Sequence, residues 1–159
     1  MKRNILIFSL AIILASCTGF IKKDTQEDAG WIVSLDEAVA LSEKTGKPIM
    51  ANFTGSDWCG WCKRLKAEVF DTPEFKDWAS DNVILLELDF PRRTAISDEL
   101  KKQNYKLQRE FGVRGYPTIH FFDASKSDAN SYNFTKIAQS RYLQGGPEAW
   151  IQDANNKLQ

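Results

Sequence analysis

Several residue types are scarce in this sequence, and each scarcity excludes a class of protein. The 159 residues include three Cys and one His. Three Cys are too few for a disulfide-stapled scaffold or for a zinc site made of four cysteines. The 21 Lys and Arg side chains are matched by 21 Asp and Glu, so the formal net charge is zero. A chain with this balance lacks the strong basic patch of a nucleic-acid-binding protein.

The remaining composition is that of one globular domain. Hydrophobic residues make up 43% of the chain, charged residues 26% and aromatic residues 12%. This is enough apolar material for a packed core, and the length suits one domain rather than two. The chain contains no internal repeat and no low-complexity stretch. We expect it to be a monomer that binds no nucleic acid.

The N-terminal residues have the features of a bacterial export signal. A short positive region, Lys2 and Arg3, precedes an apolar run from Ile5 to Leu14. The run is too short to span a bilayer, which takes about 20 apolar residues, but it suits the apolar region of a signal peptide. The segment that ends at Cys17 resembles the lipobox of bacterial lipoproteins. This resemblance implies cleavage before Cys17 and a lipid on its sulfur; the alternative is an ordinary signal peptide with an accidental Cys.

These features predict three parts of the chain. Residues 1–16 are the expected lipoprotein signal peptide, and residues 17–30, which are polar, are a tether after the lipidated Cys17. Residues 31–159 are the expected folded domain. An alternative for residues 31–33 is an ordered first strand. The lipid would hold the domain on a membrane surface without spanning it.

The folded part alternates between helical and strand patterns. Helices are predicted at 36–44, 59–70, from Thr72 onward, 94–110 and 147–157, and strands at 48–54, 83–90, 118–122 and 134–142. The segment 83–90 is almost continuously apolar, as in a strand covered on both faces. The order predicts an α/β fold in which an early parallel pair of strands is followed by an antiparallel edge.

Two cysteines three positions apart open the second predicted helix. A helix start presents unpaired N–H groups that stabilise a thiolate, so Cys59 is the expected nucleophile. Cys62 lies one turn further on and is placed to resolve a mixed disulfide. A purely structural disulfide is the alternative. The other metal-ligating side chains, Cys17 and His120, are unsuited to complete a zinc site, and His120 is expected in the core.

Two segments resemble the thioredoxin family. Residues 56–63, Ser-Asp-Trp-Cys-Gly-Trp-Cys-Lys, are similar to its active site, and residues 111–118, Phe-Gly-Val-Arg-Gly-Tyr-Pro-Thr, to its cis-proline loop. The resemblance implies a thioredoxin-like fold, a central mixed β-sheet flanked by helices. It implies that Pro117 is cis, that the Tyr116 backbone binds the substrate chain, and that the disulfide needs no cofactor and no metal. We expect Trp58 and Trp61 to form an apolar rim for that chain.

The sequence departs from the family at its buried charge pair. The position nearest to the family's buried Asp holds Asn52, and the position of its Lys partner falls near Leu85. An amide does not accept a proton in this pH range. Glu68, Asp57 or water are the candidate replacements. The basic pair that follows the second strand, Arg92 and Arg93, is expected in a solvated loop.

The expected function is that of a lipid-anchored thiol–disulfide oxidoreductase on the periplasmic side of the bacterial cell envelope. Its substrates would be protein disulfides, and a membrane electron donor or acceptor would restore its dithiol. The dipeptide Gly60-Trp61 contains no His to stabilise the thiolate, which favours a reductant over an oxidant. The alternative is a thioredoxin-like binding or chaperone module with a static disulfide.

Overall fold

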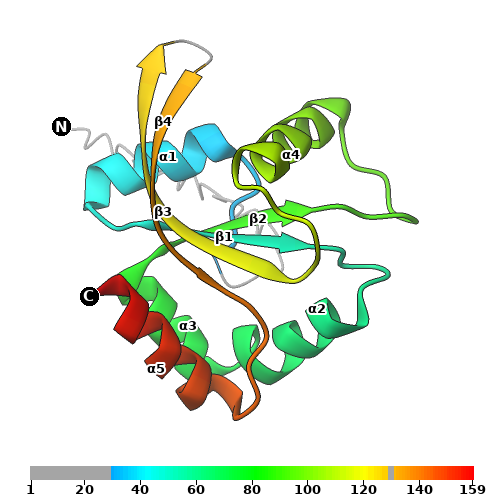
Figure 1. Ribbon diagram of the computed structural model, residues 1–159, viewed down its shortest axis with the longest axis vertical. Coiled ribbons are helices and arrows are strands. Elements are labelled where there is room, and N and C mark those ends of the chain that lie inside the picture. Colours follow the sequence, from blue (N-terminus) through cyan, green and yellow to red (C-terminus); the bar gives the residue numbers. More distant parts are fainter. Residues whose placement is uncertain (1–29, 129–130) are drawn as a thin grey trace, which may run out of the picture.

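Four strands form a single sheet at the centre of the molecule. The computed structural model describes residues 30–128 and 131–159, so the predicted signal peptide, Cys17 and nearly all of the predicted tether lie outside the described residues. Strands β1 (Ile49–Thr54), β2 (Ile84–Asp89), β3 (Thr118–Asp128) and β4 (Ser131–Ser140) lie in the order β2-β1-β3-β4 (Figure 1). The pair β1–β2 is parallel and the other two pairs are antiparallel, which confirms the predicted mixed sheet.

Helices cover both faces of this sheet. One face carries α1 (Leu35–Thr45) and α4 (Asp98–Glu110). The other carries α2 (Gly60–Leu65), the π-helical turn η1 (Lys66–Phe70), α3 (Pro73–Asn82) and α5 (Gly146–Leu158) (Figure 1). The β1–α2 connection and the loop after β2 meet at one end of the sheet. This end holds the two cysteines.

Local sequence sets the helix starts. The side-chain oxygens of Ser34, Thr72 and Ser97 each accept a hydrogen bond from a backbone N–H of the first turn that follows. Such caps satisfy donors that have no partner within the helix. Ser97 also explains why α4 begins at Asp98 and not at residue 94 as predicted.

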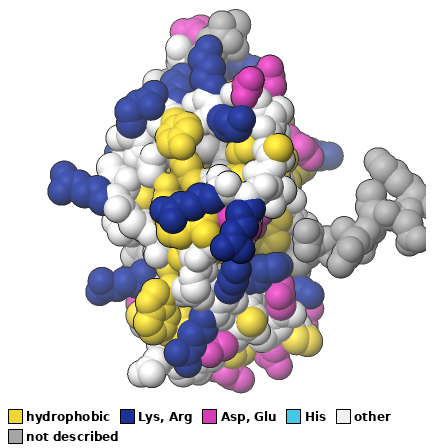
Figure 2. Space-filling model, turned by 90° about the vertical axis from the view of Figure 1, so that its right-hand side faces the viewer, with side chains coloured by type: hydrophobic (Ala, Val, Ile, Leu, Met, Phe, Trp, Pro, Cys, Tyr) yellow, Lys and Arg dark blue, Asp and Glu magenta, His cyan; other side chains and the backbone are white. Residues whose placement is uncertain are grey.

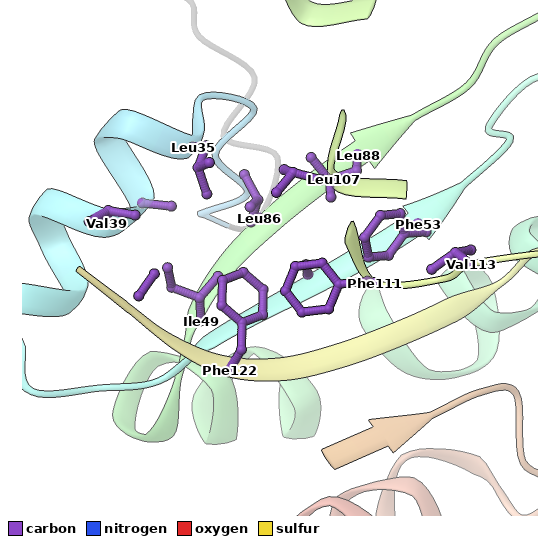
Figure 3. Close-up of a cluster of buried hydrophobic side chains, with 13 residues drawn as sticks. Leu35, Val39, Ile49, Phe53, Leu86, Leu88, Leu107, Phe111, Val113 and Phe122 are labelled. Atoms are coloured by element: carbon purple, nitrogen blue, oxygen red, sulfur yellow. The ribbon is translucent and has the colours of Figure 1, made fainter. Parts of the chain in front are cut away.

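Strand alternation divides the core into two clusters. Every residue of β1 is buried. One cluster lies between the sheet and the helices α1 and α4. It contains Ile49, Ala51 and Phe53 of β1, together with Phe111, which follows α4, and Phe122 of β3 (Figure 3). Met50 packs on the opposite face, in a cluster centred on Trp150 of α5, which is fully buried. Strands β1 and β3 are the two inner strands of the sheet. Strand β2, the strongest strand signal in the sequence, lies at the sheet edge, where its outer side forms a bridge with Ile32.

Other predicted elements also differ from the structure in their extent, and the predicted strand 134–142 is found at Ser131–Ser140. The predicted helix 59–70 divides at Lys66, where a π-turn begins and the Asp71 N–H donates to the Lys66 carbonyl five residues back. Strand β3 continues beyond the predicted residue 122 to Asp128. The polar residues of this extension do not indicate a strand, but their backbone groups pair with β4 in a long hairpin. The alternative first strand, residues 31–33, is reduced to one bridge between Ile32 and Leu86.

Candidate functional site

The two cysteines form a disulfide at the start of α2. Cys59 is the N-cap residue, and the Cys62 N–H donates to the Cys59 Sγ over 3.2 Å. When the bond is reduced, this N–H is placed to stabilise a thiolate on Cys59. The side chains are nearly buried, with 7% of Cys59 and 5% of Cys62 exposed. The arrangement suits a nucleophile at Cys59 and a resolving thiol at Cys62.

The proline loop lies beside the residue that precedes Cys59. The Tyr116–Pro117 peptide bond is cis, as the resemblance to thioredoxin implies. The Tyr116 ring meets the edge of Trp58 at 5.8 Å and stacks on Phe90 at 5.1 Å. Its hydroxyl accepts a hydrogen bond from the Gln108 side chain, and burial raises the pKa of Tyr116 to about 12. The Tyr116 side chain therefore acts as packing, which leaves its backbone as the group available to a substrate chain.

Trp58 is held on every side. Its Nε1 donates to the Phe90 carbonyl over 2.8 Å, and the Arg92 guanidinium lies 3.7 Å from the ring centre. On its other side the ring lies so close to Gly55 that a Cβ there would come within 2.5 Å of it. Only glycine fits at this turn position. Trp58 thus forms a fixed wall of the site.

Trp61 projects from the first turn of α2. It is 56% exposed, as predicted from its place at a helix start. Its ring contacts Tyr142 at 5.3 Å, and the Arg64 guanidinium lies within 5.6 Å of both ring centres. Lys and Arg side chains are spread among hydrophobic patches over this end of the molecule (Figure 2). A surface of this kind suits an extended peptide with apolar and acidic groups.

Asp57 binds the loop after β2. Its carboxylate accepts hydrogen bonds from the backbone N–H groups of Arg92, Arg93 and Thr94, at 2.6–3.2 Å. These bonds, with Arg92 first, lower the pKa of Asp57 to about 2. The loop is therefore an ordered partner of Asp57 and not merely solvated. A carboxylate with so low a pKa is a weak base, and its hydrogen bonds hold Asp57 against the 92–94 loop.

Glu68, another candidate replacement for the family's Asp, is engaged with two other side chains. Its carboxylate accepts hydrogen bonds from the Tyr142 hydroxyl and from Arg64. These bonds, the Tyr142 one first, lower the pKa of Glu68 and hold it as an anion. Its partners lie on the outer side of α2, beside Trp61.

A cavity lies against Cys62. It measures about 140 Å³, and its wall includes Cys62, Asn52 and Glu87. Asn52 is buried, and its Oδ1 has no hydrogen-bond partner within the described part of the chain. Glu87 is the register partner of Asn52 on β2. The expected absence of the family's charge pair at Asn52 and Leu85 does not mean that this part of the sheet lacks charge. Leu85 packs in the core, and the Glu87 residue, two positions further along β2, is the one paired with Asn52.

Sequence reasoning missed Glu87, although a signal was present. In the strand Ile84–Asp89 the inner positions Leu86 and Leu88 are apolar, as a covered strand requires. Glu87 interrupts this run on the face that carries the cysteines. A charged residue inside a strand covered on both faces needs a polar partner or a solvent-filled cavity.

His120 lies in the core, as predicted. It is 7% exposed and packs between the rings of Phe53 and Phe111. Burial, with Lys136 nearby, lowers its pKa to about 4, so the imidazole is neutral at pH 7. Within residues 30–128 and 131–159, no three His, Cys, Asp or Glu side chains are grouped to hold a metal ion. None of the helices in the described ranges has the length and apolar character to cross a membrane.

A mixed sheet whose central strand leads into a Cys-X-X-Cys helix, with a cis-proline loop beside it, defines a thiol–disulfide oxidoreductase of the thioredoxin type. Residues 35–129 match the family described as a thioredoxin-like domain, and the chain belongs to this family. The redox group is the Cys59–Cys62 disulfide itself.

Its relatives include disulfide oxidoreductases. Disulfide bond reductase DsbH of Chlamydia pneumoniae is 30% identical over 125 residues, which cover 79% of this chain and 70% of that protein. Thioredoxin-related protein DsbJ of the same organism is 26% identical over 89 residues, or 56% of this chain and 26% of DsbJ. A solved structure of a DsbH oxidoreductase has a TM-score of 0.71 at 30% identity and covers 80% of this chain and 83% of that one.

Proposed function

We propose that this protein is a reductase of protein disulfides, held by a lipid on Cys17 at the periplasmic side of the bacterial envelope. Cys59 attacks a disulfide in the substrate, Cys62 releases the mixed disulfide, and a membrane electron donor restores the dithiol. The observation that carries the proposal is the Cys59–Cys62 disulfide at the start of α2.

The reducing direction is supported by the residues between the cysteines. Strong oxidants of this fold owe their potential to a stabilised thiolate in the reduced form. Gly60 and Trp61 bring neither a charge nor an imidazole to the Cys59 sulfur. The relative that matches 79% of the chain bears the name of a disulfide bond reductase. A less stabilised thiolate makes the dithiol a better electron donor.

A protein substrate is supported by the shape of the site. Trp58 and Trp61 flank Cys59, and the Tyr116–Pro117 loop lies against Trp58. A backbone edge at Tyr116 suits an extended chain, which adds main-chain hydrogen bonds to the disulfide exchange. Trp61, exposed and backed by Arg64, offers the apolar contact. We therefore assign Trp58, Trp61, Tyr116 and Pro117 to substrate binding.

Trapping of the mixed disulfide tests the function. In the Cys62→Ala variant, Cys59 still attacks but the mixed disulfide is not resolved, so envelope extracts should contain Cys59-linked substrates that disappear on reduction. The matched control is the Cys59→Ser, Cys62→Ala double variant, which should trap nothing. If the single variant also traps nothing, the disulfide is static and the protein is a binding module.

The lipid anchor has its own test. Labelled glycerol added to growing cells should enter the wild-type protein and the Cys59→Ser variant but not the Cys17→Ser variant. Incorporation that does not depend on Cys17 would contradict the anchor and leave the exchange activity unaffected, because the exchange uses Cys59 and Cys62.

A further inference from the structure

Basic side chains surround the segment that leads into the first cysteine. The Lys63 ammonium donates to the Asp57 carbonyl over 3.0 Å, and the Arg92 guanidinium lies 3.7 Å from the centre of the Trp58 ring. The Arg93 side chain interacts by its charge with the Asp57 carboxylate, which also accepts the Arg93 N–H. Three cations from α2 and from the loop after β2 therefore meet beside the two residues that precede the disulfide.

The cis-proline loop contributes a fourth cation. Arg114 is exposed and lies two residues before Tyr116. The Tyr116 ring meets the edge of Trp58 at 5.8 Å, and the backbone of this loop is the edge that we assign to the substrate chain. The two loops that border Trp58 thus each carry an exposed guanidinium, Arg93 on one loop and Arg114 on the other.

Three nearby carboxylates are engaged within the fold. Asp57 accepts backbone N–H groups of the loop after β2, and Asp89 accepts the N–H and the hydroxyl of Ser56. On the outer side of α2, Glu68 forms an ion pair with Arg64. These acidic groups are therefore fixed in place by donors of the same chain.

The guanidinium groups of Arg93 and Arg114 are open to a ligand. Both side chains are exposed, and neither forms an ion pair with a carboxylate within residues 30–128 and 131–159. A guanidinium presents its donors in a planar fork that matches the two oxygens of a carboxylate. Each loop therefore offers a place for an Asp or Glu side chain of a bound segment.

The positive charge is local to this end of the molecule. The chain as a whole has a formal net charge of zero. Lys and Arg side chains extend across the middle of the face in Figure 2, whereas Asp and Glu side chains lie mostly toward its margins. An excess of one sign on one face of a neutral protein directs the approach of a partner of opposite charge.

We propose that Arg93 and Arg114 select protein disulfides that are flanked by acidic residues. The inference rests on the proposed exchange function and names a substrate class for it: an extended segment with Asp or Glu within a few residues of its reacting Cys. The backbone of the segment lies along Tyr116, and its carboxylates bind the guanidinium groups of the two loops. An anionic lipid surface fits less well, because a membrane against this face would close the disulfide to protein substrates.

Rates of exchange with matched peptides test this preference. Three peptides of equal length carry one disulfide each, flanked by acidic, neutral or basic residues. The full chain with Cys17→Ser, reduced and kept in micelles of a nonionic detergent, is mixed with excess peptide. Acid quench, thiol alkylation and mass spectrometry give the rate of protein oxidation at about 20 mM and about 500 mM salt, between which the Debye length falls from about 20 Å to about 4 Å.

Two variants remove the same amount of positive charge. The Arg93→Gln, Arg114→Gln pair and the single change Arg114→Glu each lower the charge of the site by two units. Because Arg93 adjoins Asp57, Arg114→Glu keeps the test valid if the paired variant is unfolded by its melting curve. Lys44→Glu is the matched control, since Lys44 is an exposed cation of α1 and precedes β1, whose other end leads to the disulfide.

At low salt the Cys17→Ser parent should react about tenfold faster with the acidic peptide than with the basic one, and high salt should remove most of this difference. Both arginine variants should lose most of the preference, measured as the ratio of the two rates. Lys44→Glu should keep the ratio of the parent. The neutral peptide is the reference for general effects on the thiols.

A parent ratio near one at low salt, or a ratio that neither arginine variant lowers, would overturn the selection of acidic substrates and leave the exchange activity in place. Sedimentation with phosphatidylglycerol vesicles measures the alternative partner. Vesicle binding that Arg114→Glu abolishes, with the peptide ratio unchanged, would assign the charge to a membrane surface and also overturn the proposal. If none of the three peptides oxidised the dithiol of the parent, the proposed function itself would be contradicted.

Discussion

The Arg92 guanidinium lies 3.7 Å from the centre of the Trp58 ring. The two residues are 34 positions apart, and the same pair of segments is tied again by Asp57, which accepts the backbone N–H groups of Arg92 to Thr94. The turn before Cys59 and the loop after β2 therefore form one rigid unit. This unit fixes the wall of the disulfide site next to the nucleophile.

Substitution of Gly55 should disturb this wall. In Gly55→Ala the new Cβ would meet the Trp58 ring at 2.5 Å, so the ring must leave Arg92 and the Phe90 carbonyl. Overpacking of this kind costs about 1–3 kcal/mol. Chemical denaturation of the oxidised protein measures the loss. Gly115→Ala, whose Cβ would have no heavy atom within 4 Å, is the control and should be close to neutral.

Asp57 should make stability depend on pH in the acid range. Its pKa is about 2 in the folded protein, below the ordinary value of about 4. A depressed carboxyl pKa adds stability that is fully present above about pH 4 and is lost as the pH falls through about 2. Asp57→Asn should lower the melting temperature at pH 7. The difference from the wild type should shrink toward pH 2, as thermal unfolding across this range will measure. A difference that stays constant over the range would show that charge at Asp57 does not contribute.

Trp61 should matter for protein substrates and not for folding. Because it is 56% exposed, Trp61→Ala should change the free energy of unfolding by about 0.5 kcal/mol or less. Loss of an exposed aromatic anchor should weaken binding of a disulfide-containing peptide about tenfold. Reduction of a small disulfide such as oxidised glutathione should stay the same. Ile137→Ala, an exposed apolar residue on β4, is the control and should alter neither activity. An equal loss with both substrates would place the role of Trp61 at the disulfide itself.

The reduction potential of the Cys59–Cys62 pair should lie near the reducing end of the family. We expect a value close to about −270 mV, as for thioredoxin, because Gly60 and Trp61 do not stabilise the thiolate. Equilibration of the full chain, with Cys17→Ser, against dithiothreitol or glutathione couples gives the value. A potential near about −120 mV would reverse the direction of electron flow and make the protein a disulfide donor.

The residues close together in sequence already defined much of this protein. The spacing of Cys59 and Cys62 at a predicted helix start indicated the redox pair, and the alternation of helices and strands indicated a mixed sheet. Caps and turns at Ser34, Thr72 and Gly46 set element ends within a few residues. Such signals are local because a cap or a short disulfide involves neighbours along the chain.

Tertiary structure alone decided what surrounds the disulfide. Apolar content alone did not show that β2 lies at the edge of the sheet, because a helix-covered edge strand is as apolar as a central one. The register of β1 and β2 places Glu87 beside Asn52, and a shift by one residue would turn Glu87 to the other face. Asp57 and Glu68 were equally good candidates in the sequence. Their hydrogen bonds to the 92–94 backbone and to Tyr142 come from chain packing, and these contacts lower the pKa of both carboxylates.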